Sequence, residues 1–343
     1  MKNKHKNIPI FIPHMGCPNM CVFCNQRSIS GKTCFDREAV RGEIEEALGT
    51  IDPTSEVEIA YFGGSFTGID RSLMIYLLDI AEEFVKREDD GRAKIVGIRM
   101  STRPDYINSE ILDILKNYTI SAIELGLQSM DDEVLSASRR GHTAAQAEQA
   151  CRLIKSRGYY LVGQMMIGLP YSSIEKEIYT ARKIADMGCD GARIYPTVVF
   201  YDTELANMTE SGKYNPLELD DAVKRSAEAL KVFRARGVDC IRIGLCASDN
   251  LSDNSCVLGG ANHAAMGELV LGELYFDMMC EQIECAVQGR SFKVAEFEIP
   301  FGYTSKVLGQ KGKNRERLKK IFGIEKIKIT EKNIKTIRLI GLS

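Results

Sequence analysis

The sequence lacks any uninterrupted apolar run near the roughly 18 residues that a membrane-spanning helix needs. Its longest candidate, Leu161 to Tyr171, is shorter and contains Gln164. A secretory signal is also lacking, because the apolar stretch Ile8 to Ile12 after the basic start is too short for a signal core and contains a proline. We therefore predict a cytoplasmic protein that does not enter a membrane.

An even set of cysteines is lacking too, since the chain has 11. A stable disulfide framework is disfavoured in the cytosol, so an odd number of cysteines without even spacing indicates free thiols and a metal site. Low-complexity segments are absent, and a composition of 44% hydrophobic and 27% charged residues excludes the disordered and fibrous classes. A length of 343 residues favours two domains over one.

Acidic side chains are scarce at the carboxyl end. Residues 300–343 contain 12 lysines and arginines against three glutamates, a net charge of +9, whereas the whole chain carries −2. The remainder of the chain is therefore strongly acidic, at −11. A basic module attached to an acidic body suggests a polyanionic partner, although a solvated charged face without a partner gives the same composition.

Short β-rich apolar runs alternate with longer amphipathic runs in the first 245 residues. Six such β–α units in series predict an α/β fold with a parallel sheet and right-handed crossovers, either open or curled into a partial (β/α)6 barrel. Ligands are then expected at the carboxyl ends of the strands. The predicted strands are Ile8 to Ile12, Val57 to Phe62, Lys94 to Met100, Ser121 to Leu127, Tyr159 to Ile167 and Gly191 to Tyr195.

Helix starts and domain limits can also be predicted. Asp36, Asn108 and Ser173 are expected N-caps, since their side-chain oxygens can accept hydrogen bonds from the first backbone N–H groups of a helix. A seventh strand candidate, Asp239 to Gly244, and a helix-like stretch, Ala264 to Gln288, continue the body. A small α+β segment comes last. The expected domains are a barrel over 1–245, a helical extension that completes it over 246–292 and a basic module over 293–343.

Three cysteines follow the first predicted strand in a C-x-x-x-C-x-x-C run. We call residues 16–25, which hold Cys17, Cys21 and Cys24, the cysteine loop. Three thiolates on one short loop can hold a soft metal. A closed structural zinc site needs a fourth ligand, for which His14 would have to fold back. A 4Fe–4S cluster has four irons, so three thiolates leave one iron open to another ligand.

The cysteine spacing, with Phe23 before the third cysteine, resembles that of the radical S-adenosylmethionine superfamily. In that superfamily the open iron chelates S-adenosylmethionine, and an electron from the reduced cluster splits a carbon–sulfur bond to give a 5′-deoxyadenosyl radical. The resemblance implies a radical SAM barrel and a radical SAM enzyme with a 4Fe–4S cluster on Cys17, Cys21 and Cys24. It also implies S-adenosylmethionine as the second cofactor and a protein partner that reduces the cluster.

Further motifs match the superfamily in the expected order. A Gly-Gly-Ser run follows the second strand and matches the glycine motif for the methionine amino group, although serine stands where glutamate is often found. The E-L-G-L-Q-S and R-R-G-H-T segments resemble those of the coproporphyrinogen-dehydrogenase and elongator-catalytic-subunit branches, and a glutamine stands near the place of a ribose-binding aspartate. The S-adenosylmethionine contacts that the resemblance implies are Gly63, Gly64, Ser65, Gln128, Arg140 and Gln164.

The most extensive likeness, over about residues 8–235, is to the radical half of the elongator catalytic subunit family, which modifies tRNA. It rests on S-T-R-P-D-Y at 101–106, R-G-H-T at 140–143 and I-Y-P-T-V-V at 194–199. That family has a wider first cysteine gap, and this chain has no room for its acetyltransferase domain, so the acetyl-CoA-dependent reaction is not carried over. The resemblance implies an RNA-modifying enzyme, with tRNA as the expected substrate, and it identifies no catalytic residue.

A G-x-x-G run lies between two short predicted helices in the basic module. It resembles the loop of a KH module, which clamps a few nucleotides of single-stranded RNA. Glycines at a helix start let phosphates approach backbone donors, and nearby cations add attraction. A purely structural cap is the alternative. The predicted RNA contacts are Gly309, Gln310, Lys311, Gly312, Lys313 and Arg315.

Two other functions stay open at this stage. The same radical chemistry could act on a small-molecule or porphyrin-like substrate, with the basic module only covering the barrel. Alternatively, the chain could be a non-catalytic RNA-binding protein whose cluster senses redox state or iron. Cys246, Cys256 and His263 lie in a polar loop after the seventh strand and receive no role.

Overall fold

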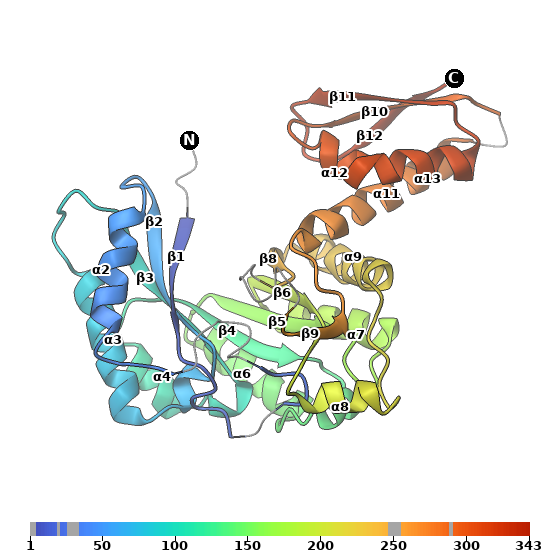
Figure 1. Cartoon of the computed structure of the whole chain (residues 1–343). Helices are drawn as coiled ribbons and strands as arrows, with labels where there is room; N and C mark the ends of the chain where they lie inside the picture. The colour runs from blue at the N-terminus through green and yellow to red at the C-terminus, as the bar shows by residue number, and fades with distance from the viewer. Residues whose placement is uncertain (1–4, 19–20, 26–33, 246–254, 288–290) are drawn as a thin grey trace.

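The computed structural model describes residues 5–18, 21–25, 34–245, 255–287 and 291–343. Within them, the body is a curved seven-stranded sheet in the order β1-β2-β3-β4-β5-β6-β8, and every neighbouring pair is parallel. Helices cover its outer face (Figure 1). The strands are β1 (His5–Phe11), β2 (Glu56–Phe62), β3 (Lys94–Thr102), β4 (Ile120–Gln128), β5 (Leu161–Ile167), β6 (Gly191–Pro196) and β8 (Asp239–Ile243).

This architecture confirms the predicted partial barrel of parallel β–α units, and the seventh strand candidate is β8. The helices of the body in the described residues are α2 (Val40–Thr50), α3 (Arg71–Val85), α4 (Ser109–Leu115), α5 (Asp132–Ala137), α6 (Ala144–Ser156), α7 (Ile174–Asp186), α8 (Glu204–Glu210), α9 (Leu219–Ala235) and α11 (Met266–Val287). None of these described helices is both long and apolar enough to cross a membrane.

Two of the three predicted N-caps are confirmed. The side chain of Asn108 accepts from the Ile111 N–H at 2.9 Å, and that of Ser173 accepts from Lys176 N–H at 3.4 Å. The prediction for Asp36 is wrong. Its carboxylate accepts from the Glu38 N–H in a local turn, which competes with helix capping, and α2 begins only at Val40.

The two faces of the sheet differ in chemistry because side chains alternate along each strand. Outward residues pack under the helices, as when the buried Tyr61 donates its hydroxyl to the Leu77 carbonyl of α3 at 2.6 Å. The inner face instead carries a buried ionic network. The carboxylate of Glu124 accepts from Arg99 at 2.9 Å and from Arg193 at 2.7 Å. Arg193 also lies over the Phe62 ring, so the network reaches across the inside of the barrel.

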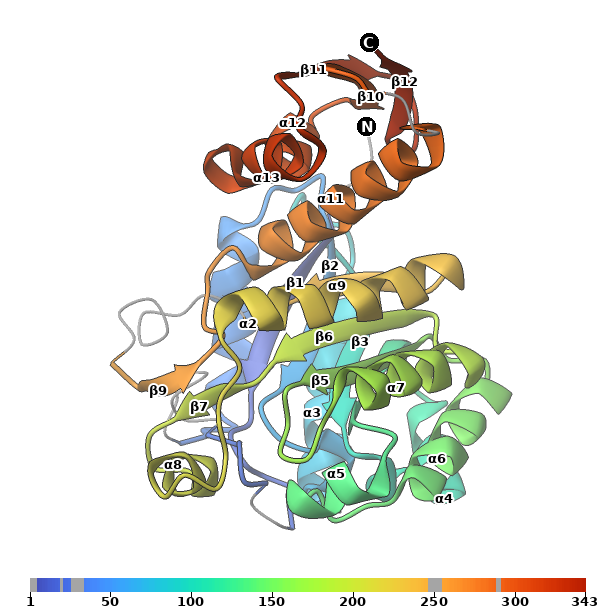
Figure 2. The same cartoon turned by 90° about the vertical axis from the view of Figure 1, so that its right-hand side faces the viewer.

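The carboxyl-terminal module has its own three-stranded sheet in the order β11-β10-β12, with β10 parallel to β11 and antiparallel to β12. Its core includes Tyr275, Phe276 and Met279 of α11, a helix that also lies beside α9 of the body (Figure 2). The small α+β domain is thus confirmed, whereas its KH-like nature and the domain limits at 245 and 292 stay predictions. Its elements are β10 (Val294–Pro300), α12 (Thr304–Leu308), η3 (Gln310–Gly312), α13 (Lys313–Phe322), β11 (Lys326–Lys332) and β12 (Arg338–Leu342).

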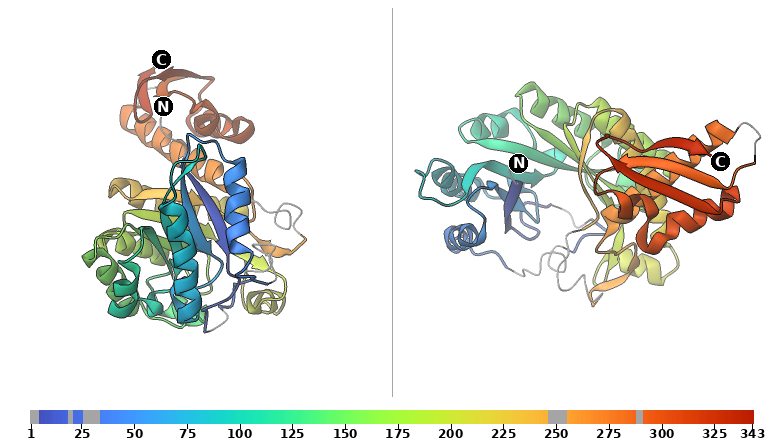
Figure 3. Two further views of the ribbon diagram at one scale, coloured as in Figure 1. Left: turned by 90° about the vertical axis from the view of Figure 1, so that its left-hand side faces the viewer. Right: turned by 90° about the horizontal axis from the view of Figure 1, so that it is seen from above.

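The module and the cysteine loop lie at opposite ends of the molecule. β1 begins on the side of the module and runs away from it, so the chain that follows β1 is at the far end of the body (Figure 1). Seen from above, the module stands over the later strands and to one side of β1–β3 (Figure 3). A ligand that touched both regions would therefore have to be long.

Candidate functional site

The two residues that precede the cysteine loop, His14 and Met15, are hydrogen-bonded to the glycine loop at 63–65, which follows β2. The N–H of Ser65 donates to the Met15 carbonyl at 3.0 Å, and the N–H of His14 donates to the Gly63 carbonyl at 2.9 Å. A methyl group on Gly64 would lie 2.3 Å from the Met15 carbonyl oxygen, so no other residue allows this approach. The structure thus brings the predicted cysteine ligands and the predicted Gly63 to Ser65 contacts to one place.

Two buried arginines flank the cysteines. Arg140 directs Nη1 to the Cys21 Sγ at 3.4 Å and donates from Nη2 to the Gly126 carbonyl at 2.6 Å. Arg103, only 2% exposed, holds the Asp105 carboxylate with two nitrogens at 3.0 and 2.9 Å, and it donates to the Arg140 carbonyl at 2.6 Å. In the described part of the chain, Nε of Arg140 and Nη1 of Arg103 are buried without a hydrogen-bond partner.

The charge of these arginines also acts on the Cys17 thiol. Burial raises the pKa of the Cys17 thiol above its usual value, and the neighbouring Arg103 and Arg140 oppose that rise. Without a metal, Cys17 is therefore a protonated thiol at neutral pH. A metal ion changes this balance, because a coordinating thiol loses its proton.

Two glutamine side chains, one from β4 and one from the adjacent strand β5, also belong to the site. Gln164 of β5 donates from Nε2 to Oε1 of Gln128 at 3.3 Å. Gln128 ends β4 with a φ of 66°, a strained value for a side chain of this size. A Cβ on Gly126 would lie 2.7 Å from the Arg140 guanidinium and 2.9 Å from the Gln128 amide. Arg140, Gln128 and Gln164, which were predicted from separate segments, thus lie close together.

Sequence reasoning missed a hydroxyl network and the role of Arg103. The buried Ser65 hydroxyl lies 2.9 Å from that of Thr102, which in turn lies 2.6 Å from that of Thr67, and the Arg103 N–H donates to Ser65. The Ser65 side chain therefore ties the end of β3 to the glycine loop. The available signal for Arg103 was its position two residues before Asp105, directly after β3. The spacing of the two residues does not show that Arg103 is buried.

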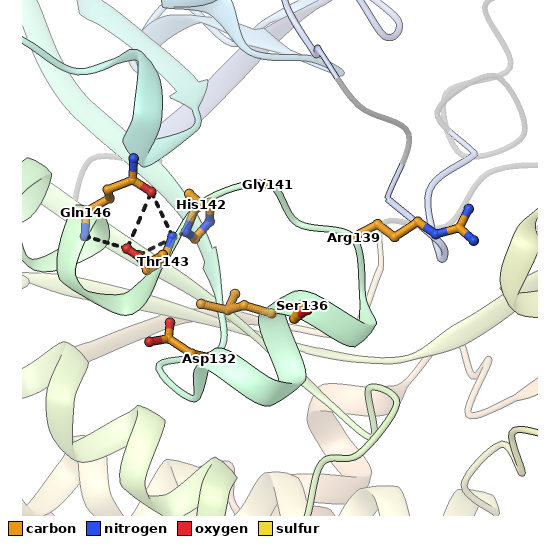
Figure 4. A pocket seen from close by; sticks show the side chains of 8 residues that line it. Asp132, Ser136, Arg139, Gly141, His142, Thr143 and Gln146 are labelled. Carbon is orange, nitrogen blue, oxygen red and sulfur yellow. Dashed lines mark hydrogen bonds between the residues drawn. The ribbon is translucent and has the colours of Figure 1, made fainter.

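A pocket of about 690 Å³ lies between α5 and α6, and Arg139 is one of its lining residues (Figure 4). Its wall includes His142, and the Thr143 and Gln146 side chains form a capping box at the start of α6. Burial lowers the pKa of His142 to about 4, and the nearby Arg140 acts in the same direction. The ring is therefore neutral at physiological pH, and it adds no charge to the two arginines.

The predicted RNA-binding loop has the expected local shape. α12 ends at Leu308, Gly309 and Gly312 have φ values of 74° and 77°, and α13 begins at Lys313. Lys311 is exposed at the tip of this turn. Lys313 is instead engaged by Asp220 of α9 at 2.8 Å, and Arg315 by Glu316 at 3.1 Å. Among the described residues, Lys311 is thus the cation of the loop that no carboxylate engages.

The chain resembles curated proteins in sequence, and one of them is named for tRNA. The chain is 29% identical over 206 residues to Elongator complex protein 3 of Schizosaccharomyces pombe, covering 55% of this chain and 38% of that protein. It is 28% identical over 202 residues to tRNA uridine(34) acetyltransferase of Methanocaldococcus infernus, covering 54% and 37%. The chain thus spans less than half the length of these two relatives.

Solved structures share the fold. The Methanocaldococcus infernus Elp3 structure with an N-terminal deletion covers 88% of this chain and 68% of that chain, with a TM-score of 0.64 and 20% identity. Coproporphyrinogen III oxidase (HemN) from Escherichia coli covers 68% and 53%, with a TM-score of 0.50 and 16% identity.

The residues present fit an iron–sulfur cluster and S-adenosylmethionine. Thiols are the donors that iron–sulfur clusters use, and the two unpaired buried N–H groups of Arg103 and Arg140 suit an anionic group beside the cysteines. Within the described residues, no three Cys, His, Asp or Glu side chains already stand in the geometry of a metal site.

The family comparison agrees with this chemistry. Residues 189–275 match the Radical SAM C-terminal domain, and residues 11–184 match the radical SAM superfamily. Enzymes of this superfamily use a 4Fe–4S cluster and S-adenosylmethionine. The match over residues 11–184 covers half of the chain and contains all three cysteines of the loop. The chain therefore belongs to the radical SAM superfamily.

Proposed function

We propose that this radical SAM enzyme modifies tRNA, with a 4Fe–4S cluster on Cys17, Cys21 and Cys24. The observation that carries the proposal is the contact of Arg140 with Cys21, because the same guanidinium also donates to the Gly126 carbonyl and so joins the cysteine loop to the end of β4, which carries Gln128. When bound, the two cofactors together supply a carbon-centred radical that takes a hydrogen atom from the substrate. We further propose a separate protein as the electron donor and the cytoplasm as the compartment.

The chain's own residues bind and orient. We assign the carboxylate of S-adenosylmethionine to the unpaired guanidinium N–H groups of Arg140 and Arg103, since an anion there would satisfy both donors. The backbone of Gly63 and Gly64 and the amides of Gln128 and Gln164 supply neutral polar groups for the rest of that cofactor. The Ser65 hydroxyl, which is already engaged by Thr102, positions the glycine loop.

The name of the Methanocaldococcus infernus relative and the basic module support RNA as the substrate. The relatives' acetyl transfer is not proposed here, because the chain covers only part of their length. The module and the cysteine loop lie far apart, so a substrate that contacts both must be long and negatively charged. A folded tRNA meets this requirement, whereas a small molecule does not. A porphyrin-like substrate or a sensing role would leave tRNA unchanged.

The direct experiment compares modified nucleosides in total tRNA from cells with and without the gene, with nucleoside mass spectrometry as the readout. One nucleoside should be missing without the gene and return with the native chain, but not with the Cys21→Ala variant. An identical nucleoside set in all samples would overturn tRNA as the substrate.

Replacing Lys311 by glutamate should weaken tRNA binding. Each phosphate contact contributes to the salt dependence of binding, so the slope of log affinity against log salt should fall by about one when a contact is lost. Filter binding across a salt series measures this. Lys86→Glu, a change at an exposed lysine of the body, is the control. Equal slopes for both variants and the native chain would assign the G-x-x-G loop a structural role only.

A further inference from the structure

Tyr171 is an exposed aromatic residue in a strained conformation. Its side chain is 69% exposed, the highest value among the large hydrophobic residues of the described chain, and its φ is 61°. A bulky residue with positive φ is an outlier, because Cβ crowds the backbone there, and glycine adopts such a φ without cost. Burial of the ring does not offset the free-energy cost of this backbone conformation, because the ring is exposed. Neither packing nor backbone preference therefore explains a tyrosine at this position.

The turn that carries Tyr171 is held from several sides. The buried Glu177 carboxylate accepts from the Gly168 N–H at 2.6 Å and from the Ser172 hydroxyl at 2.9 Å. Arg225 binds both oxygens of that carboxylate. The Tyr214 hydroxyl donates to the Gly168 carbonyl at 2.5 Å. Strain of this kind persists when the surroundings fix it, and the ring is therefore presented on a rigid support.

A groove of about 310 Å³ lies between this turn and the loop that joins α8 to α9. Besides Tyr171, its lining includes Lys213 and Asn215, which are both exposed. Lys213 forms no ion pair with any residue that the structure describes. An aromatic face, a cation and an amide group together match the base, the phosphate and the polar edge of a nucleotide.

The groove is connected to the cysteine loop. Tyr214, which follows Lys213, packs in one apolar cluster with Val22 and Phe23, the residues between Cys21 and Cys24. The N–H of Leu205 also donates to the Val22 carbonyl at 2.8 Å. A nucleotide in the groove would thus lie at the same end of the barrel as the proposed cofactor site.

We propose that a single-stranded nucleotide of the RNA substrate stacks on Tyr171 with its phosphate on Lys213. This inference rests on the proposed function, since it needs an RNA substrate. It adds a contact region at the cofactor end of the body, whereas the G-x-x-G loop lies in the module at the other end. Single-stranded bases expose their faces, and aromatic stacking on them tolerates any sequence.

The test measures binding of unfractionated tRNA to the full chain. Tyr171→Gly should lower the affinity by about 5- to 150-fold, the range found for loss of one stacked base, with an unchanged salt slope. Lys213→Ala should lower the salt slope by about one, and Tyr171→Phe should bind as the native chain does. Tyr179→Ala, which removes an exposed tyrosine from α7, is the control.

The stability of Tyr171→Gly separates recognition from folding. Because glycine suits a φ of 61°, this variant should unfold at the same temperature as the native chain or a higher one. Native affinity in Tyr171→Gly would overturn the inference and leave the proposed function in place, with the nucleoside comparison still deciding that function. No salt-dependent tRNA binding by the native chain would overturn both.

Discussion

Replacing Cys21 by alanine is expected to reduce the cleavage of S-adenosylmethionine to the level of a protein-free control. Cys21 is buried, and its sulfur lies 3.4 Å from the Arg140 guanidinium. The variant would keep only two of the three thiolate ligands, which are too few to hold the cluster. The open iron position would be lost with the cluster. The readout is 5′-deoxyadenosine formed under anaerobic conditions with a chemical reductant.

Cys285→Ala is the matched control, because Cys285 is an exposed thiol on α11, far along the chain from the cysteine loop. It should retain the full rate and iron content of the native chain. Iron bound per chain, measured in parallel, separates loss of the cluster from loss of folding. Persistent cleavage in Cys21→Ala would mean that this thiol is not a ligand.

Replacing Glu124 by alanine is expected to cost about 3–5 kcal/mol of folding stability, the usual effect of removing one partner from a buried ionic network. Glu124 lies between Arg99 and Arg193 on the inner face of the sheet and accepts hydrogen bonds from both. Without Glu124, the buried guanidiniums of Arg99 and Arg193 lose the negative charge that they share. Denaturant unfolding monitored by circular dichroism gives the change in free energy.

Two further variants make this result specific. Glu124→Gln keeps the shape and removes only the charge, so it should lose less stability than Glu124→Ala. Glu83→Ala removes the partner of Arg41 in an exposed pair and should leave the unfolding midpoint unchanged. If Glu124→Ala unfolded like the native chain, the inner ionic network would contribute little to the barrel.

Local patterns predicted the body well because the β–α alternation follows from periodicity within each segment. The strand at 159–167 is β5 (Leu161–Ile167), and the seventh strand candidate is β8. The short antiparallel pair β7 (Val198–Phe200) and β9 (Val257–Gly260) was not predicted. Its strands lie far apart in the chain, and a pairing of that kind leaves no local pattern.

The candidate site shows the same limit. Motif order predicted Arg140, Gln128 and Gln164 separately, and the structure brings them together. Arg103 was missed because the buried guanidinium donates to the Arg140 carbonyl, and that carbonyl belongs to a loop distant in the sequence. The RNA contact of Lys313 stays a prediction, and the ion pair of Lys313 with Asp220, 93 residues away in the sequence, could not be predicted from spacing. Contacts over such separations are set by the fold and not by spacing.

The most direct test is Mössbauer spectroscopy of the anaerobically reconstituted native chain with and without S-adenosylmethionine. We expect about four irons per chain and a changed signal from one of them when S-adenosylmethionine is added, because three thiolates leave one iron accessible. A zinc ion in place of iron, or a spectrum that S-adenosylmethionine does not alter, would contradict the proposed cofactor site.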